Sequence, residues 1–178
     1  MSEKKKDTNP DSILTTMNKL PLPFYLFVVV AAVGLGGIHG FYPNLSKFFQ
    51  ERFNYDNEEA ARITAAPYMV GSIVTPLSGF LLTKVGPNYY EKIIMVSLAL
   101  LLAVHAAYWL MPNGKGDMWC VVPILVFGAA HSMFTTCFSP MVRKLISETD
   151  LLPFCFSMLA LVNKMSVASS CYIAGLIR

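Results

Sequence analysis

One lysine stands in the middle of an otherwise uncharged apolar stretch near the C-terminal end of the chain. Lys164 lies within residues 151–177, which contain no other charged side chain. An ionised lysine at the centre of a bilayer costs about 2.5–3.5 kcal/mol on insertion scales, so it normally faces a cavity, a carboxylate or backbone carbonyls. The other long apolar stretches contain no Asp or Glu to pair with it. We therefore interpret Lys164 as a contact for an anionic solute, or else as a structural lysine that pairs with a partner subunit or extends to the membrane surface.

Several amide and imidazole side chains also stand among small apolar residues. His39 lies in the glycine-rich segment 34–40, where backbones can approach closely or a helix can break. Histidine can relay protons near neutral pH. A packed histidine bonded to a neighbouring helix is the commoner arrangement, and we favour it for His39, His105 and His131. The candidate residues for contact with a substrate or partner in the membrane are Lys164, Asn163, His39, Asn44 and His131.

Sequence patterns for catalysis or metal binding are missing. The chain has no nucleophile motif, phosphate loop, carboxylate pair or dinucleotide fingerprint. The histidines do not have the spacing of a metal site, and the 4 cysteines lie in apolar runs without a CxxC pair. We therefore expect no enzyme, no cofactor and no metal.

The composition places these residues in a lipid bilayer. The chain is 54% hydrophobic and only 14% charged, whereas soluble domains carry about 25% charged residues, and its mean hydropathy is +0.51. The net charge of +3 is small and no basic stripe interleaved with aromatic residues occurs. We therefore expect a lipid bilayer as surroundings and no nucleic acid as a partner.

Five apolar stretches are long enough to position these side chains inside a membrane, because a spanning helix needs about 20 residues. The sequence predicts an all-α membrane protein with a polar N-terminal tail, residues 1–20, and a single transmembrane helical domain, residues 21–178. The charged segment 47–62 reads as an extension of the first helix plus a short interfacial turn, with Asp56 or Asn57 capping the next helix. The predicted spans are 22–42, 63–82, 93–111, 118–142 and 151–177.

Basic residues predict the orientation of these spans. Eight lysines and arginines fall on the side of the N-terminus and five on the other side. Because basic loops remain on the cytoplasmic side, we expect the N-terminus in the cytoplasm, or in the matrix if the membrane is the mitochondrial inner membrane.

The turn between the second and third spans carries the most specific motif. Residues 79–86 read Gly-Phe-Leu-Leu-Thr-Lys-Val-Gly. This segment resembles the loop motif of the major facilitator superfamily of two-lobed transporters, Gly-x-Leu-x-Asp-Lys/Arg-x-Gly. Thr83 occupies the position of the acidic residue in this motif. In that family the carboxylate at this position helps to hold helices together through a charge interaction, and threonine lacks that charge. The matching residues are Gly79, Leu81, Lys84 and Gly86.

The resemblance extends over about residues 20–178 and is to helices seven to eleven of the C-terminal lobe of these transporters. It is carried by the segments 41–44, 48–53, 65–77 and 139–142. It is nearest to the lysosomal-type and domain-containing branches of the family. The resemblance implies a site near the middle of the membrane, with Lys164 close to a central cavity, and movement by rocking of two lobes.

Two interpretations of function follow. A single lobe that lacks its last helix has no opposing half, so the one we favour is a non-catalytic accessory or structural subunit of a larger membrane complex, with the mitochondrial inner membrane as one candidate location. The start at Met1 and a polar tail held by neighbouring subunits would fit that reading. The alternative is a fragment or half of a secondary-active solute transporter working by alternating access. The expected partners are other membrane subunits or a missing transporter half, together with a small solute.

Overall fold

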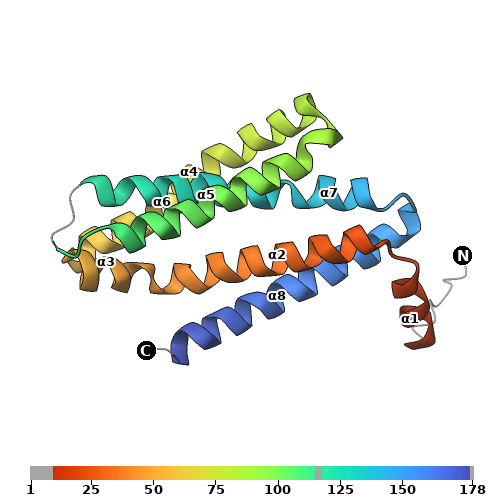
Figure 1. The fold of residues 1–178 in the computed structure, drawn as a ribbon, viewed down its shortest axis with the longest axis horizontal. Coiled ribbons are helices and arrows are strands. Elements are labelled where there is room, and N and C mark those ends of the chain that lie inside the picture. The colour runs from red at the N-terminus through yellow and green to blue at the C-terminus, as the bar shows by residue number, and fades with distance from the viewer. Residues whose placement is uncertain (1–9, 115–117, 177–178) are drawn as a thin grey trace, which may run out of the picture.

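The computed structural model describes residues 10–114 and 118–176, and these residues form helices joined by short turns (Figure 1). Within these described residues, five helical stretches are long and apolar enough to cross a membrane. The expectation that neighbouring subunits hold the start of the chain concerns residues 1–9, which lie outside the described part.

The first and fourth spans are each built from two consecutive helices. In the first, the short turn Tyr42–Asn44 joins α2 to α3, and in the fourth, α6 is followed directly by α7. The helices are α1 (Pro10–Asn18), α2 (Leu22–Phe41), α3 (Leu45–Phe53), α4 (Asn57–Val85), α5 (Tyr90–Leu110), α6 (Val121–Thr136), α7 (Phe138–Leu145) and α8 (Leu152–Leu176).

The turn between α3 and α4 is fixed by two polar residues. Asn54 adopts the left-handed conformation with φ of 52°, which ends α3. The Asp56 carboxylate accepts the backbone N–H of Glu59 at 2.7 Å, and the Glu59 carboxylate accepts the backbone N–H of Asp56 at 3.4 Å. This capping box starts α4 at Asn57, six residues before the predicted start at residue 63.

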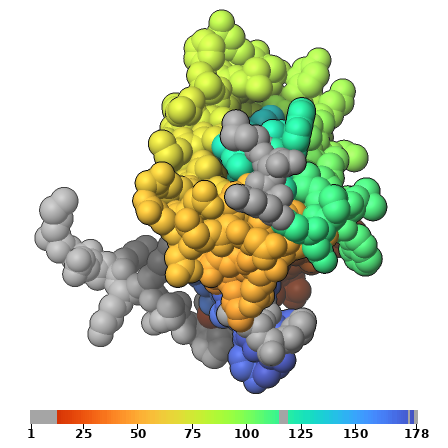
Figure 2. Space-filling model, turned by 90° about the vertical axis from the view of Figure 1, so that its left-hand side faces the viewer, coloured from red at the N-terminus to blue at the C-terminus, as the bar shows by residue number. Residues whose placement is uncertain are grey.

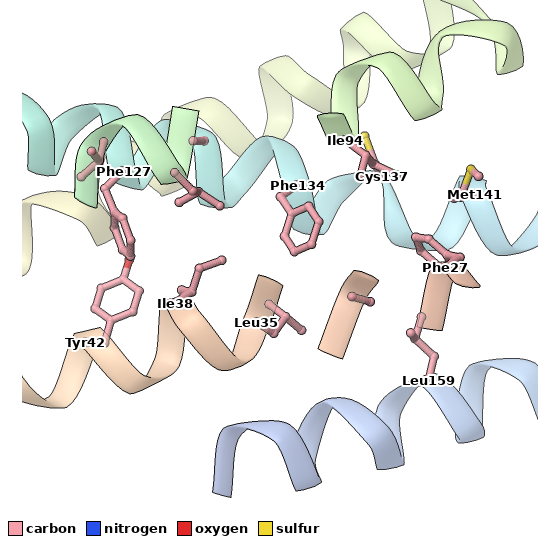
Figure 3. Close-up of a cluster of buried hydrophobic side chains, with 14 of the residues drawn as sticks. Phe27, Leu35, Ile38, Tyr42, Ile94, Phe127, Phe134, Cys137, Met141 and Leu159 are labelled. Carbon is pink, nitrogen blue, oxygen red and sulfur yellow. The ribbon is translucent and has the colours of Figure 1, made fainter. Parts of the chain in front are cut away.

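Helix α6 lies at the centre of the bundle, between α4 and α5, while α2 pairs with α8 along a second layer (Figure 1). The core fills the space between α2 and α6 (Figure 3). Phe127 and Tyr42 point toward one another there, with ring centroids 5.2 Å apart. Phe134 and Ile38 continue the same layer and are fully buried.

Small residues set the spacing of the two tightest helix pairs. A Cβ atom added to Gly128 of α6 would lie 2.6 Å from the carbonyl oxygen of Pro67 in α4. A Cβ atom on Gly36 of α2 would lie 2.5 Å from the hydroxyl of Ser166 in α8. That hydroxyl donates a hydrogen bond of 2.5 Å to the carbonyl oxygen of Ala32, so a polar contact crosses the α2–α8 pair.

One arginine ties together the end of the bundle formed by α3 and α5. The Arg52 guanidinium donates to the carbonyl oxygens of Trp109 at 3.1 Å and Met111 at 2.8 Å. It also lies 5.6 Å from the ring centroids of both Phe48 and Phe53. Figure 2 views the molecule from this end and shows α3 and the start of α4 massed beside the end of α5, with α8 at the lower margin.

Candidate functional site

Four aromatic side chains with polar atoms meet where α2, α4 and α6 approach one another. The rings of His39 and His131 contact edge to face, with centroids 5.8 Å apart. Tyr42 touches both, at 6.2 Å and 5.8 Å. Tyr68 of α4 stacks on Tyr42 at 5.0 Å. We call these four residues the His–Tyr cluster.

The spacing of α4 and α6 brings Tyr68 to this cluster. Gly128 allows the backbone of α6 to reach Pro67, which directly precedes Tyr68. One turn farther along each helix, a Cβ atom on Gly71 would lie 2.8 Å from the Ser132 hydroxyl, next to His131. Small residues on both helices therefore bring α4 close to α6, and Tyr68 stacks on Tyr42, which in turn contacts His131.

Lys164 lies on α8, which packs along α2, the helix that carries His39. The side chain is exposed, and within the described residues it makes no hydrogen bond or ion pair. The carbonyl oxygen of the Asn163 side chain is buried and has no hydrogen-bond partner in the same part of the chain. Two adjacent residues of α8 thus carry polar atoms that no other described residue satisfies.

These polar groups lie at middle depth in their spans. His39 is near the centre of 22–53, His131 near the centre of 121–145, and Lys164 somewhat past the centre of 149–173. Tyr68 is 61% exposed although its ring stacks on the buried Tyr42. The cluster therefore opens on a side of the bundle that the described residues leave uncovered. An ammonium group, imidazoles and phenol hydroxyls there can bind a carboxylate and neighbouring hydrogen-bonding groups.

The structure separates the other candidate residues from this cluster. Asn44 donates to the carbonyl oxygen of Gly40 at 3.1 Å, at the junction of α2 and α3. The His105 ring lies 2.7 Å from the carbonyl oxygen of Leu101 and packs against Phe41. His39 and His131 contact one another, and neither ring makes a hydrogen bond within the described residues.

The loop motif makes a tight turn at the far end of α4. Gly86 has φ of 77°, which favours glycine. The Thr83 hydroxyl donates to the carbonyl oxygen of Phe80 at 2.7 Å, in its own helix. The Lys84 ammonium lies 4.8 Å from the centroid of the Phe80 ring. Leu81 is exposed, and nothing lies within 4 Å of a Cβ atom on Gly79. The motif is about three helical turns or more from Tyr68 and contributes nothing to the cluster.

Two members of the cluster are not among the candidates from the sequence. Tyr42 and Tyr68 read as aromatic residues of apolar spans, and each adjoins a proline. The sequence feature that could have identified them is the phenol hydroxyl in the middle of a span. Such a hydroxyl needs a polar neighbour, as a histidine does. Which neighbour it finds depends on the pairing of α4 with α6.

Comparison with known proteins identifies the family of the chain. The model of the Major Facilitator Superfamily matches residues 2–169. The chain belongs to the major facilitator superfamily. This agrees with the observed helices and confirms the predicted fold class, an all-helical membrane protein with five candidate spans that fits part of the facilitator fold.

The curated relatives are transporters. The chain is similar to the protein named lysosomal dipeptide transporter MFSD1 from Bos taurus, with 23% identity over 92% of this chain and 33% of the relative. The MFSD1 proteins of Gallus gallus and Homo sapiens are 24% and 22% identical, over 78% and 92% of this chain. The chain thus spans about a third of the length of the curated relatives it matches. No solved structure matches it.

These findings correct the interpretation of function that the sequence favoured. A family of transporters and relatives named as transporters agree with the transport alternative better than with an accessory subunit. Neither the accessory role nor the mitochondrial location has any support among them. The chain is an integral membrane protein related to transporters.

Proposed function

We propose that this chain forms the C-terminal lobe, through its fifth span, of a solute transporter that works by alternating access. The order of its motifs supports this assignment, and the transporter names of its relatives support the activity. Alternating access rocks two lobes about a site at the middle of the membrane. The proposed activity therefore requires an opposing lobe, on the same polypeptide or on a companion chain.

The observation that carries the proposal is the His–Tyr cluster, together with Lys164 on α8, the helix that packs along α2. Polar side chains at middle depth are costly unless they line a cavity or meet a ligand. Here they come from α2, the turn that follows it, α4, α6 and α8, and Tyr68 is exposed on a side of the bundle that the described residues leave uncovered. An opposing lobe across this side would enclose them in a central cavity.

The chemistry of the cluster favours a small solute with a carboxylate and an amide. The Lys164 ammonium would bind the carboxylate by a charge-assisted hydrogen bond. The tyrosine hydroxyls and the imidazoles supply donors and acceptors for an amide group, and the buried carbonyl oxygen of Asn163, without a partner among the described residues, is a further acceptor on α8. A dipeptide has both groups, and the relatives' names give that substrate class. The excess of basic residues on the side of the N-terminus supports its placement on the cytoplasmic side, and the relatives' names support a lysosome-type membrane.

Uptake of a labelled dipeptide into proteoliposomes tests the proposal, using the chain together with its opposing lobe. We expect Lys164→Met to lower uptake about tenfold or more, because a charge-assisted bond to the solute is lost, and Lys164→Arg to retain part of it. Lys92→Met is the matched control, because Lys92 is exposed at the start of α5 and contacts Tyr89.

Two outcomes would contradict different parts of the proposal, the solute site or the transport function. Uptake by Lys164→Met equal to that of the unchanged protein would reject this solute site while leaving transport intact. A protein that takes up no dipeptide or related anionic solute, although correctly assembled, would reject the transport function itself.

A further inference from the structure

Two adjoining hollows lie at the end of the bundle opposite Arg52. A polar pocket of about 500 Å³ is lined by residues that include Tyr90, Ser139, Arg143 and Lys144. An apolar groove of about 330 Å³ runs between α2, α5 and α7. Figure 1 shows α5 leaning away from α2 toward this end, with α7 between them.

The pocket carries an excess of positive charge. The Lys144 ammonium donates to the Glu91 carboxylate at 2.7 Å, which neutralises one of its two cations. Arg143 is exposed and makes no hydrogen bond or ion pair within the described residues. The Ser139 hydroxyl and the Tyr90 phenol line the same space. A guanidinium beside two hydroxyl groups suits a phosphate.

The groove and the pocket are lined by neighbouring residues of α5 and α7. Leu145 of the groove follows Lys144 of the pocket on α7, and Glu91 lines the groove while pairing with Lys144. The groove extends along α5 from Glu91 to Leu98, about 10 Å at 1.5 Å per residue. Its rim includes exposed apolar side chains, Leu26 and Met95. A free phosphate would leave this apolar length empty, whereas a lipid tail would cover it.

We propose that the pocket and groove together bind one anionic phospholipid. Its phosphate lies against Arg143, Ser139 and Tyr90, and the upper part of one acyl chain lies between Val30 of α2 and Met95 of α5. Basic pockets between transmembrane helices bind anionic lipid headgroups in this manner. The site is on the outside of the helix bundle and is independent of the proposed solute site.

Native mass spectrometry of the purified chain, titrated with dioleoyl phosphatidylglycerol, tests this proposal. We expect one phosphatidylglycerol to bind more tightly than dioleoyl phosphatidylcholine, and Arg143→Gln to weaken it about tenfold by removing a charge-assisted hydrogen bond. Arg62→Gln is the matched control, because Arg62 is an exposed arginine on the first turns of α4 that pairs with Glu58.

Two further variants test the two halves of the site. Glu91→Gln frees Lys144 from its partner, so we expect binding of phosphatidylglycerol to tighten severalfold. Val30→Trp fills the groove, so we expect it to weaken the lipid while leaving glycerol phosphate unaffected. Thermal melting of each variant identifies any that fails to fold, and the tightening by Glu91→Gln cannot arise from misfolding.

Equal binding of the two lipids, together with no effect of Arg143→Gln, would overturn the site. Binding of glycerol phosphate as tight as that of the lipid, unchanged by Val30→Trp, would overturn the lipid as its occupant in favour of a free phosphate.

Discussion

Helices α6 and α8 belong to spans of nearly equal hydropathy, but their surroundings differ. In the most apolar part of the span of α6, 44% of the residues are buried, against 11% in that of α8. Helix α6 is enclosed by α4, α5 and α2, whereas α8 packs along α2 through serines. Hydropathy therefore identifies a span without indicating what covers it. On α8, Ser166 and Ser170 mark the face packed on α2, and Lys164 and Asn163 add polar groups inside an apolar span.

The largest effect is expected when a methyl group is added to α6, the enclosed helix. Gly128→Ala would place a Cβ atom 2.6 Å from the backbone oxygen of Pro67, which cannot rotate away. We expect the α4–α6 pair to separate and the free energy of unfolding to fall by about 1–3 kcal/mol, as for other overpacked sites. Thermal melting of the purified protein in detergent measures this change.

Gly79→Ala is the control on the other partner of that pair, since nothing lies within 4 Å of a Cβ atom there. It should be neutral or stabilising, because alanine favours a helix over glycine by up to about 1 kcal/mol. Equal melting of the two variants would contradict the close α4–α6 packing.

A smaller loss of stability is expected where α2 packs against α8. Gly36→Ala meets the hydroxyls of Ser166 and Ser170 at 2.5 Å and 2.8 Å. These side chains can rotate, but Ser166 then loses its hydrogen bond to Ala32, so we expect a loss of about 1 kcal/mol. The neighbouring Gly37→Ala has open space and should lose nothing. Melting temperatures of this adjacent pair provide the comparison, and a larger loss at position 37 would mean that α8 does not pack where the structure has it.

The smallest effect on stability is expected at Lys164. Because the side chain is exposed and unpaired within the described residues, Lys164→Met should change the free energy of unfolding by no more than about 0.5 kcal/mol. Melting in detergent checks this. A large destabilisation would indicate a structural lysine and weaken its assignment to solute binding.

The positions of the spans follow from the sequence, whereas the cluster between them does not. Uncharged runs of about 20 residues fix where a helix must cross. Helix α4 starts earlier than predicted. Glu58, Glu59 and Arg62 lower the hydropathy of its first turns, although the capping box makes these turns helical. Lys164 and the two histidines are visible as polar residues in apolar spans. Tyr42 and Tyr68 acquire their role only when Gly128 brings α4 against α6, and single-sequence periodicity carries no information on that pairing.

The contacts of Arg52 affect how one end of the bundle can move. Its two bonds to the carbonyl oxygens of Trp109 and Met111 join α3 to the last turn of α5 and the residue after it, and the rings of Phe48 and Phe53 flank the same guanidinium. Force applied to α3 at this end would therefore be transmitted to α5 through these contacts. At the opposite end, the hairpin around Gly86 leans outward (Figure 1), and the ion pair of Lys144 with Glu91 at the surface links α7 to α5. We therefore expect the bundle to be stiffer at the Arg52 end than at the Gly86 end.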